Sequence, residues 1–302
     1  MPPLTDRKWS DAGGAATASL PATGTRPGAH AGRGSQDGLG KTERTDAWWL
    51  VPVSQAIGLV VLIGYANYAA ILGAAHHEYT GAGRNYLSPF YSPYIRPAWL
   101  PGWLSPALLI LIFPLGFRAT CYYYRKAYYR VFFADPVACA VGEARSKGYC
   151  GELKFPFVLQ NLHRYFLYAA LAFLVVLWWD VIKAFTFHDS QGAAQFGVGG
   201  GSLAILASTG LLTLYTFSCH SLRHLIGGKL DCFSCVAAGG PRLQAWRGVS
   251  ALNGHHMGFA WWSLAAVCFA DLYVRMCSMG VFHDPILMTI HAFDMPLSPF
   301  GP

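Results

Sequence analysis

Cysteine and histidine residues recur inside the apolar segments of this 302-residue chain, where their side chains could bind a metal or redox cofactor. The densest stretch is SCHSLRHLIGG, residues 218–228, which ends a long apolar run. Ionisable groups are costly to place in a membrane, so they indicate candidate functional sites. Three other apolar segments carry similar residues. The candidate metal ligands, of which four or fewer would be used, are Cys121, His163, Cys219, His220, His224 and His256.

Two kinds of redox centre suit these residue types. Two histidines on facing helices could hold a haem b, whose propionates would pair with nearby arginines. Two cysteines with two histidines are instead the ligand set of a Rieske-type 2Fe-2S cluster. Zinc takes the same four atoms but gives no reason for burial in a membrane. Thiolates are disfavoured in apolar surroundings, so Cys121 and Cys219 favour the cluster, while the residues alone leave haem open.

Composition indicates that these residues lie in a polytopic membrane protein. Only 12% of the residues are charged and 54% are hydrophobic, whereas a soluble domain has about 25% charged residues. The net charge of +7 fits cytoplasmic loops and anionic headgroups, and no nucleic-acid-binding module is visible. We predict an all-α bundle of five transmembrane helices. The spans are expected at residues 47–75, 106–124, 158–187, 202–222 and 252–280.

The distribution of lysine and arginine gives an orientation. Most of these residues lie in the 2–3 and 4–5 connectors and in the N-terminal segment, which places the N-terminus in the cytoplasm. Residues 1–46 are expected to be a disordered tail, residues 47–280 the membrane anchor, and residues 281–302 an extracytoplasmic tail. In this orientation all the candidate ligands lie at a similar depth, near the cytoplasmic side.

Helical periodicity sharpens this expectation. At about 100° per residue, Arg118, Cys121 and Tyr122 share one face of the second span. A polar stripe in the fourth span runs from Thr209 to His220 and continues to Arg223. Polar faces at one level imply a bundle interior built around a polar group.

The remaining cysteines give weaker signals. Cys232 and Cys235 form a lone CxxC in a connector, which could be a thiol-redox or zinc site. Cys268 and Cys277 fall in an apolar span and are expected to be packing residues. Asp271 and the loop between the first two spans could line a second quinone site or a proton route.

Four sequence blocks together resemble the membrane-anchor subunit of actinobacterial-type succinate dehydrogenase/fumarate reductase. The likeness covers about residues 45–280, and the loop segment NYLSPFYSP (85–93) fits it as well. The blocks are FRATCYYYRKAYYRVFFADPVACAV (117–141), FPFVLQNLHRYFLYAAL (155–171), LYTFSCHSLRHLIGGKL (214–230) and LNGHHMGFAWWSLA (252–265).

The resemblance implies a function in the plasma membrane. Such anchors hold a flavoprotein and an iron–sulfur subunit on the cytoplasmic face and reduce menaquinone. Anchors in the wider family bind haem b, whereas this branch is thought to use an embedded Rieske-like 2Fe-2S cluster. Electrons would enter at the basic face near Arg125, Lys126 and Arg130. The candidates for hydrogen bonds to the quinone, or to propionates, are Arg118, Tyr122, Arg164, Tyr165 and Arg223.

Other functions are alternatives at this stage. A stand-alone haem b quinol oxidoreductase would use the same histidines. A membrane thiol–disulfide oxidoreductase would depend on Cys232 and Cys235. A transporter would be expected to show repeats or broken midplane helices, and neither is evident. The oligomeric state and the physiological direction of electron flow are left open.

Overall fold

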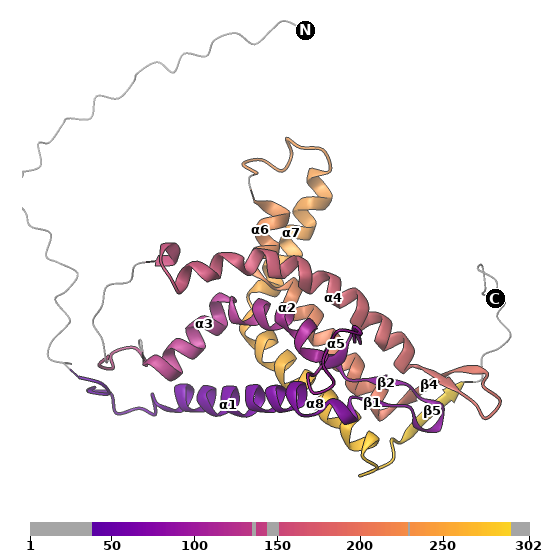
Figure 1. The fold of residues 1–302 in the computed structure, drawn as a ribbon. Coiled ribbons are helices and arrows are strands. Elements are labelled where there is room, and N and C mark those ends of the chain that lie inside the picture. The colour runs from indigo at the N-terminus through magenta and orange to yellow at the C-terminus, as the bar shows by residue number, and fades with distance from the viewer. Residues whose placement is uncertain (1–37, 135–136, 144–150, 229, 291–302) are drawn as a thin grey trace, which may run out of the picture.

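The computed structural model describes residues 38–134, 137–143, 151–228 and 230–290, and these are mostly helical (Figure 1). Most of both predicted tails lies outside these ranges. Residues 40–44 are described and hydrogen-bond to residues 139–142. The α helices are α1 Leu50–Ile71, α2 Ala107–Ala119, α3 Tyr122–Tyr128, α4 His163–Ala184, α5 Gly200–Phe217, α6 His220–Gly227, α7 Gly239–Asn253 and α8 His256–Ser278.

Four helical stretches among the described residues are long and apolar enough to cross a membrane. They are Leu50–Ile71, Phe157–Ala184, Gly200–Phe217 and His256–Ser278. Helix α1, with 22 residues, is about 33 Å long and matches a hydrocarbon core of about 30 Å. The bent pair Ala107–Ala119 and Tyr122–Phe133 would make a fifth span. The predicted polytopic helical fold is confirmed.

The second predicted span is broken rather than continuous. The helices before and after the break differ in direction by 80°, and Cys121 between them is extended, with φ −65° and ψ 127°. Thr120 Oγ1 donates to the carbonyl of Gly116 at 2.6 Å, a local bond that competes with regular helix. The prediction that Arg118, Cys121 and Tyr122 share a helical face is therefore wrong.

The fourth predicted span breaks in the same way. Helix α5 ends at Phe217, and Cys219 is extended, with φ −66° and ψ 136°. Ser218 Oγ donates to the carbonyl of Tyr215 at 2.9 Å. The predicted stripe from Thr209 to His220 is wrong because the helix stops between them.

Four helices, α3, α4, α6 and α8, begin at a candidate ligand or directly after one. Cys121 and Cys219 are the N-cap residues of α3 and α6. His163 is the first residue of α4, after a 3₁₀ turn, and His256 is the first residue of α8, after a break that separates it from α7. Interruptions of the helices thus place the four side chains.

The helices pack closely around a core that extends from α1 to α8. Helix α5 contacts α8 and α4, and α2 packs against α4. At Gly116 the contact is so close that a Cβ would lie 2.3 Å from the ring of Phe166. Helices α6 and α7 pair as a hairpin that projects from the body (Figure 1).

Short strands lie at the end of the molecule opposite this hairpin (Figure 1). Strands β1 and β2 form an antiparallel pair, and β3, β4 and β5 form an antiparallel sheet with β4 in the centre. Sequence analysis predicted none of them, including β5, which lies in the predicted C-terminal tail. The strands are β1 Glu78–Tyr79, β2 Tyr86–Leu87, β3 Thr186–His188, β4 Ala194–Gly199 and β5 Ile286–Ile290.

Asp284, which precedes β5, joins the segments at this end. Its carboxylate accepts hydrogen bonds from Arg84 (2.6 Å), Tyr86 (2.9 Å) and Tyr273 (2.6 Å), and from the backbone N–H of Gly201 (2.8 Å). Asp284 and Arg84 are both buried. The ion pair therefore fixes the segment before β5 to the loop after α1, and the hydrogen bond from Gly201 fixes it to the start of α5.

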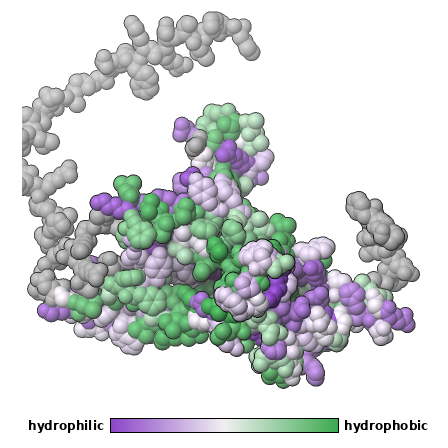
Figure 2. Space-filling view, viewed as in Figure 1, coloured by the Kyte–Doolittle hydropathy of each residue, from purple (hydrophilic) through white to green (hydrophobic). Residues whose placement is uncertain are grey.

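The surface agrees with a membrane location. Apolar side chains cover much of the helical body, whereas hydrophilic side chains gather towards the strand end (Figure 2). Helix α1 exposes a row of large apolar residues, including Ile57, Val60 and Val61. Lipid would cover such a face.

Candidate redox centre

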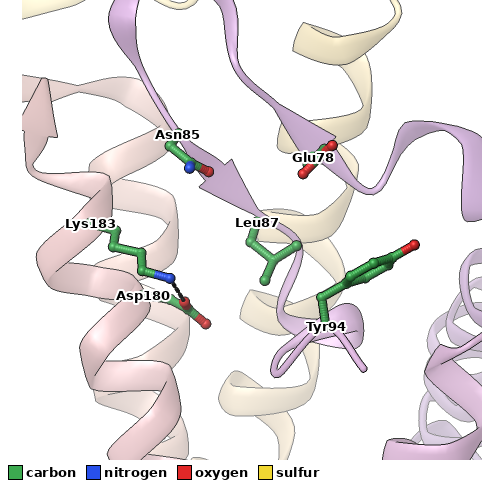
Figure 3. Close-up of a pocket in the computed structure, with 6 residues that line it drawn as sticks. All are labelled: Glu78, Asn85, Leu87, Tyr94, Asp180 and Lys183. Carbon is green, nitrogen blue, oxygen red and sulfur yellow. Dashed lines mark ion pairs between the residues drawn. The ribbon is translucent and has the colours of Figure 1, made fainter. Parts of the chain in front are cut away.

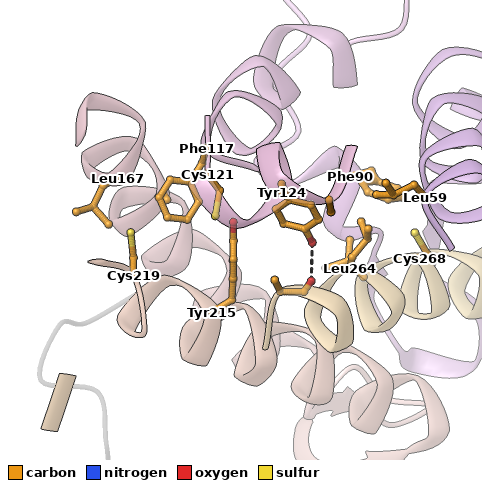
Figure 4. Close-up of a cluster of buried hydrophobic side chains, with 14 of the residues drawn as sticks. Leu59, Phe90, Phe117, Cys121, Tyr124, Leu167, Tyr215, Cys219, Leu264 and Cys268 are labelled. Atoms are coloured by element: carbon orange, nitrogen blue, oxygen red, sulfur yellow. Dashed lines mark hydrogen bonds between the residues drawn. The ribbon is translucent and has the colours of Figure 1, made fainter. Parts of the chain in front are cut away.

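Four of the six candidate ligands meet in the helical core. Cys121 Sγ lies 3.4 Å from His256 Nε2, and Cys219 Sγ lies 3.1 Å from His163 Nε2. Both sulfurs are almost fully buried, and they are seen among the core side chains in Figure 4. The residues come from four separate chain segments, as the sequence predicted.

Hydroxyl groups hold the other nitrogen of each imidazole. Thr120 Oγ1 lies 3.0 Å from His163 Nδ1, and Ser218 Oγ lies 2.7 Å from His256 Nδ1. A hydrogen bond to one ring nitrogen fixes the tautomer and orientation of a metal-binding histidine. Here it turns both Nε2 atoms towards the sulfurs.

Thr120 and Ser218 were missed by sequence analysis, although each directly precedes a candidate cysteine. The residue before each cysteine holds one histidine, and that histidine contacts the other cysteine. Thr120 holds His163, which faces Cys219, while Ser218 holds His256, which faces Cys121. The paired Thr-Cys and Ser-Cys dipeptides were the available signal.

Aromatic rings enclose the two imidazoles. Phe117 stacks on His163 with 4.6 Å between ring centroids, and Tyr215 stacks on His256 at 5.0 Å. Phe117 and Tyr215 meet edge to face at 5.4 Å. These rings cover one face of each imidazole, while both histidines stay partly exposed.

The donor set consists of residue types that can bind iron. It offers two thiols and two imidazole Nε2 atoms, which are the ligands of a Rieske-type centre. Among the described residues, no three His, Cys, Asp or Glu side chains lie together as ligands of a single metal ion; the four form two Cys–His pairs.

The other two candidate ligands lie apart from these pairs. His220 and His224 follow the break on α6, contact each other at 4.7 Å between ring centroids, and are exposed. Desolvation, with the nearby positive charges of His224 and Arg223, lowers the pKa of His220.

Arg118 is the candidate quinone-binding residue that borders the four side chains. Its guanidinium lies 4.8 Å from the ring centroid of Tyr215. It also donates to the hydroxyl of Tyr124 at 2.6 Å and to Ser263 Oγ at 3.0 Å. A positive charge is thus held beside the candidate centre.

The other quinone candidates do not gather with Arg118. Tyr122 is exposed and lies under the guanidinium of Arg125. Arg164 lies over the ring of Tyr165, and both are exposed on α4. Arg223 bridges α6 and α7, where it donates to Ser250 Oγ at 2.9 Å and lies over Trp246.

A small polar pocket lies near the strand end, between the loop after α1 and helix α4 (Figure 3). Lys183 and Asp180 form an ion pair there at 3.8 Å, and Ser92 donates to Asp180. Its volume of about 150 Å³ is below the 300–1,000 Å³ of typical ligand pockets. Asp271 does not line this pocket; it is buried in an ion pair with Arg275 at 2.6 Å.

The CxxC is closed in this structure. Cys232 and Cys235 form a disulfide in the connector between α6 and α7. Cys268 and Cys277 are buried free thiols in α8, as expected of packing residues.

Comparisons with known proteins agree with the resemblance. The profile of the family described as "Actinobacterial succinate dehydrogenase subunit SdhC" matches residues 50–280. Among solved structures, the chain is similar to one titled "Mycobacterium smegmatis Sdh1 complex in the apo form". The identity is 41%, the match covers 80% of this chain and 92% of that chain, and the TM-score is 0.69. No curated protein sequence matches the chain.

Proposed function

The chain belongs to the family of the actinobacterial succinate dehydrogenase subunit SdhC, and from this membership we propose that it delivers electrons from succinate oxidation to a membrane quinone. It is a membrane subunit, and the solved neighbour is part of a complex. Its partners would be the flavoprotein and iron–sulfur subunits, bound on the cytoplasmic face of the plasma membrane. The quinone would be menaquinone.

The observation that carries this proposal is the pairing of two thiols with two imidazoles in the helical core. Cys121, Cys219, His163 and His256 would hold a 2Fe-2S cluster, which when bound would supply a one-electron carrier. The chain itself orients the imidazoles through Thr120 and Ser218 and packs an aromatic ring against each of them. In this proposal four of the six candidate ligands bind the cluster, and His220 and His224 do not.

Quinone reduction also needs donors and protons near the centre. Arg118 is the foremost candidate because its guanidinium adjoins the four side chains and would stabilise negative charge on a quinone oxygen. Tyr122, Arg164, Tyr165 and Arg223 are further out and suit contacts at the membrane surface. In the proposed orientation, Lys126 and Arg130 of the basic segment after the α2–α3 break would face the iron–sulfur subunit.

The ligand assignment can be tested on the complex purified with its partner subunits. We expect the wild type to show an iron–sulfur EPR signal with Rieske-type features beyond those of the soluble subunits. His256→Ala should abolish that signal and quinone reduction, with flavin and the soluble clusters retained. His220→Ala, on the neighbouring helix start, should keep both.

Two outcomes would contradict the proposal. A sharp haem alpha band in the reduced complex, lost in His256→Ala, would establish a haem b centre instead. Loss of the signal in His220→Ala but not in His256→Ala would mean that the ligand set is wrong.

A further inference from the structure

Tyr215 carries a buried hydroxyl group that the packing of the core leaves unpaired. The residue is 1% exposed. Within the described part of the chain, its hydroxyl has no hydrogen-bond partner. Figure 4 shows this hydroxyl directed towards the sulfur of Cys121. Buried hydroxyl groups are normally paired, so an unpaired one that points into a candidate site requires an explanation.

The ring of Tyr215 is held from several sides. It stacks on His256 with 5.0 Å between centroids and meets Phe117 edge to face. The hydroxyl group therefore cannot swing away from Cys121 without disturbing the imidazole of His256. The residue touches one candidate ligand through its ring and faces another through its hydroxyl.

Arg118 makes this hydroxyl a stronger hydrogen-bond donor. Its guanidinium carbon lies 4.8 Å from the ring centroid of Tyr215. A positive charge over a phenol ring draws electron density from the phenol oxygen and so strengthens the O–H group as a hydrogen-bond donor. The natural acceptor for such a donor is a thiolate sulfur.

We infer that Tyr215 is a positioning residue whose hydroxyl would donate a hydrogen bond to the Cys121 sulfur when the embedded centre is bound, and would thereby raise the reduction potential of that centre. The inference rests on the proposed cluster site. A hydrogen bond to a ligand sulfur stabilises the more negative, reduced state more than the oxidised state. Tyr215 would therefore favour transfer of electrons into the membrane.

The test is a potentiometric EPR titration of the purified complex with Tyr215→Phe. This change removes only the hydroxyl. We expect the equilibrium constant for one-electron reduction of the centre to fall about tenfold, which is about 59 mV in midpoint potential, with altered g values. Tyr91→Phe is the matched control, because Tyr91 is equally buried but donates to the Ala69 carbonyl at 2.9 Å, away from the centre. Its potential should equal that of the wild type.

A second variant guards against failure of Tyr215→Phe to retain the centre. Replacement of Tyr215 by 3-fluorotyrosine keeps the ring and hydroxyl but makes the O–H more acidic, so the midpoint should rise. Unchanged potentials in the variants that load would overturn the inference, as would a change confined to the KM for quinone. Absence of the EPR signal in the wild type would instead overturn the proposed cluster, which keeps the two failures distinct.

Discussion

At the scale of single residues, the arrangement depends on two hydroxyl groups that hold the histidines. Thr120 and Ser218 each act twice, once by bonding back to the preceding helix and once by contacting an imidazole. The same side chains therefore stabilise the helix breaks and orient the candidate ligands. Their loss should affect the centre more than the fold.

Ser218→Ala should lower retention of the centre, because the Nδ1 contact of His256 would be lost. Loss of such an outer contact typically costs about 10–100-fold in metal affinity. The measurement is iron and EPR spin per flavin after incubation of the complex with a chelator. Ser208→Ala is the matched control, since Ser208 is a buried serine of α5 whose hydroxyl donates to the Ile205 carbonyl at 2.9 Å, within its own helix. Equal iron loss from both variants would contradict the role given to Ser218.

The sequence predicted that cysteines and histidines from separate helices would meet. It did not show which four of the six candidate ligands do so. Cys121, Cys219, His163 and His256 were expected to meet because each falls at a similar depth in an apolar segment. His220 was included on the same argument, but the break at Cys219 turns it to the surface. Tyr215 gave no signal, because a buried tyrosine hydroxyl is recognised as unpaired only when its neighbours are known.

At the scale of the elements, Thr120 can contact His163 because helices α2 and α4 pack closely together. That closeness depends on Gly116, whose missing side chain makes room for Phe166. Hydropathy located the helices well, because about 20 apolar residues are needed to span a membrane. It missed the breaks at Cys121 and Cys219, because neither position is a proline or glycine.

Gly116→Ala should destabilise the complex by about 1–3 kcal/mol, since an added methyl group would overpack the α2–α4 contact. Thermal unfolding in detergent, followed by loss of bound flavin and by light scattering, measures this. Gly210→Ala on α5 is the matched control, because its Cβ would meet no atom within 4 Å. There we expect no loss of stability, and an equal loss at both positions would contradict the close contact.

The disulfide of the α6–α7 hairpin allows a test between the proposed electron-transfer function and a thiol–disulfide oxidoreductase. Its disulfide joins Cys232 and Cys235 in the connector, and neither residue belongs to the two Cys–His pairs of the core. Cys232→Ser with Cys235→Ser should leave succinate–quinone activity within about twofold of the wild type, because the small loop that they close adds little to folding stability. Complete loss of activity with normal assembly and iron content would favour the thiol–disulfide reading.

At the scale of the whole molecule, the strand end is held by the buried ion pair of Arg84 and Asp284, which are 200 positions apart in the sequence. Asp284→Ala would leave a buried guanidinium without its partner, which typically costs about 3–5 kcal/mol. We expect a low yield of assembled complex by gel filtration. Adding Arg84→Met should restore part of it.

The exposed Asp231 provides the control for this prediction. Asp231→Ala should assemble normally. Failure of Arg84→Met to improve the Asp284→Ala variant would show that the hydrogen bonds from the tyrosines and Gly201, rather than the charge pair, hold this end together. Sequence analysis could not anticipate the pair, since both residues lie in segments predicted to be irregular.

The two Cys–His contacts also set the order in which the protein can mature. Cys121 and His256 are separated by 135 positions, and His163 and Cys219 by 56. A nascent chain that has inserted everything up to α7 therefore presents both thiols but only one imidazole. Any prosthetic group that requires all four side chains can be received only after the last long helix has entered the bilayer.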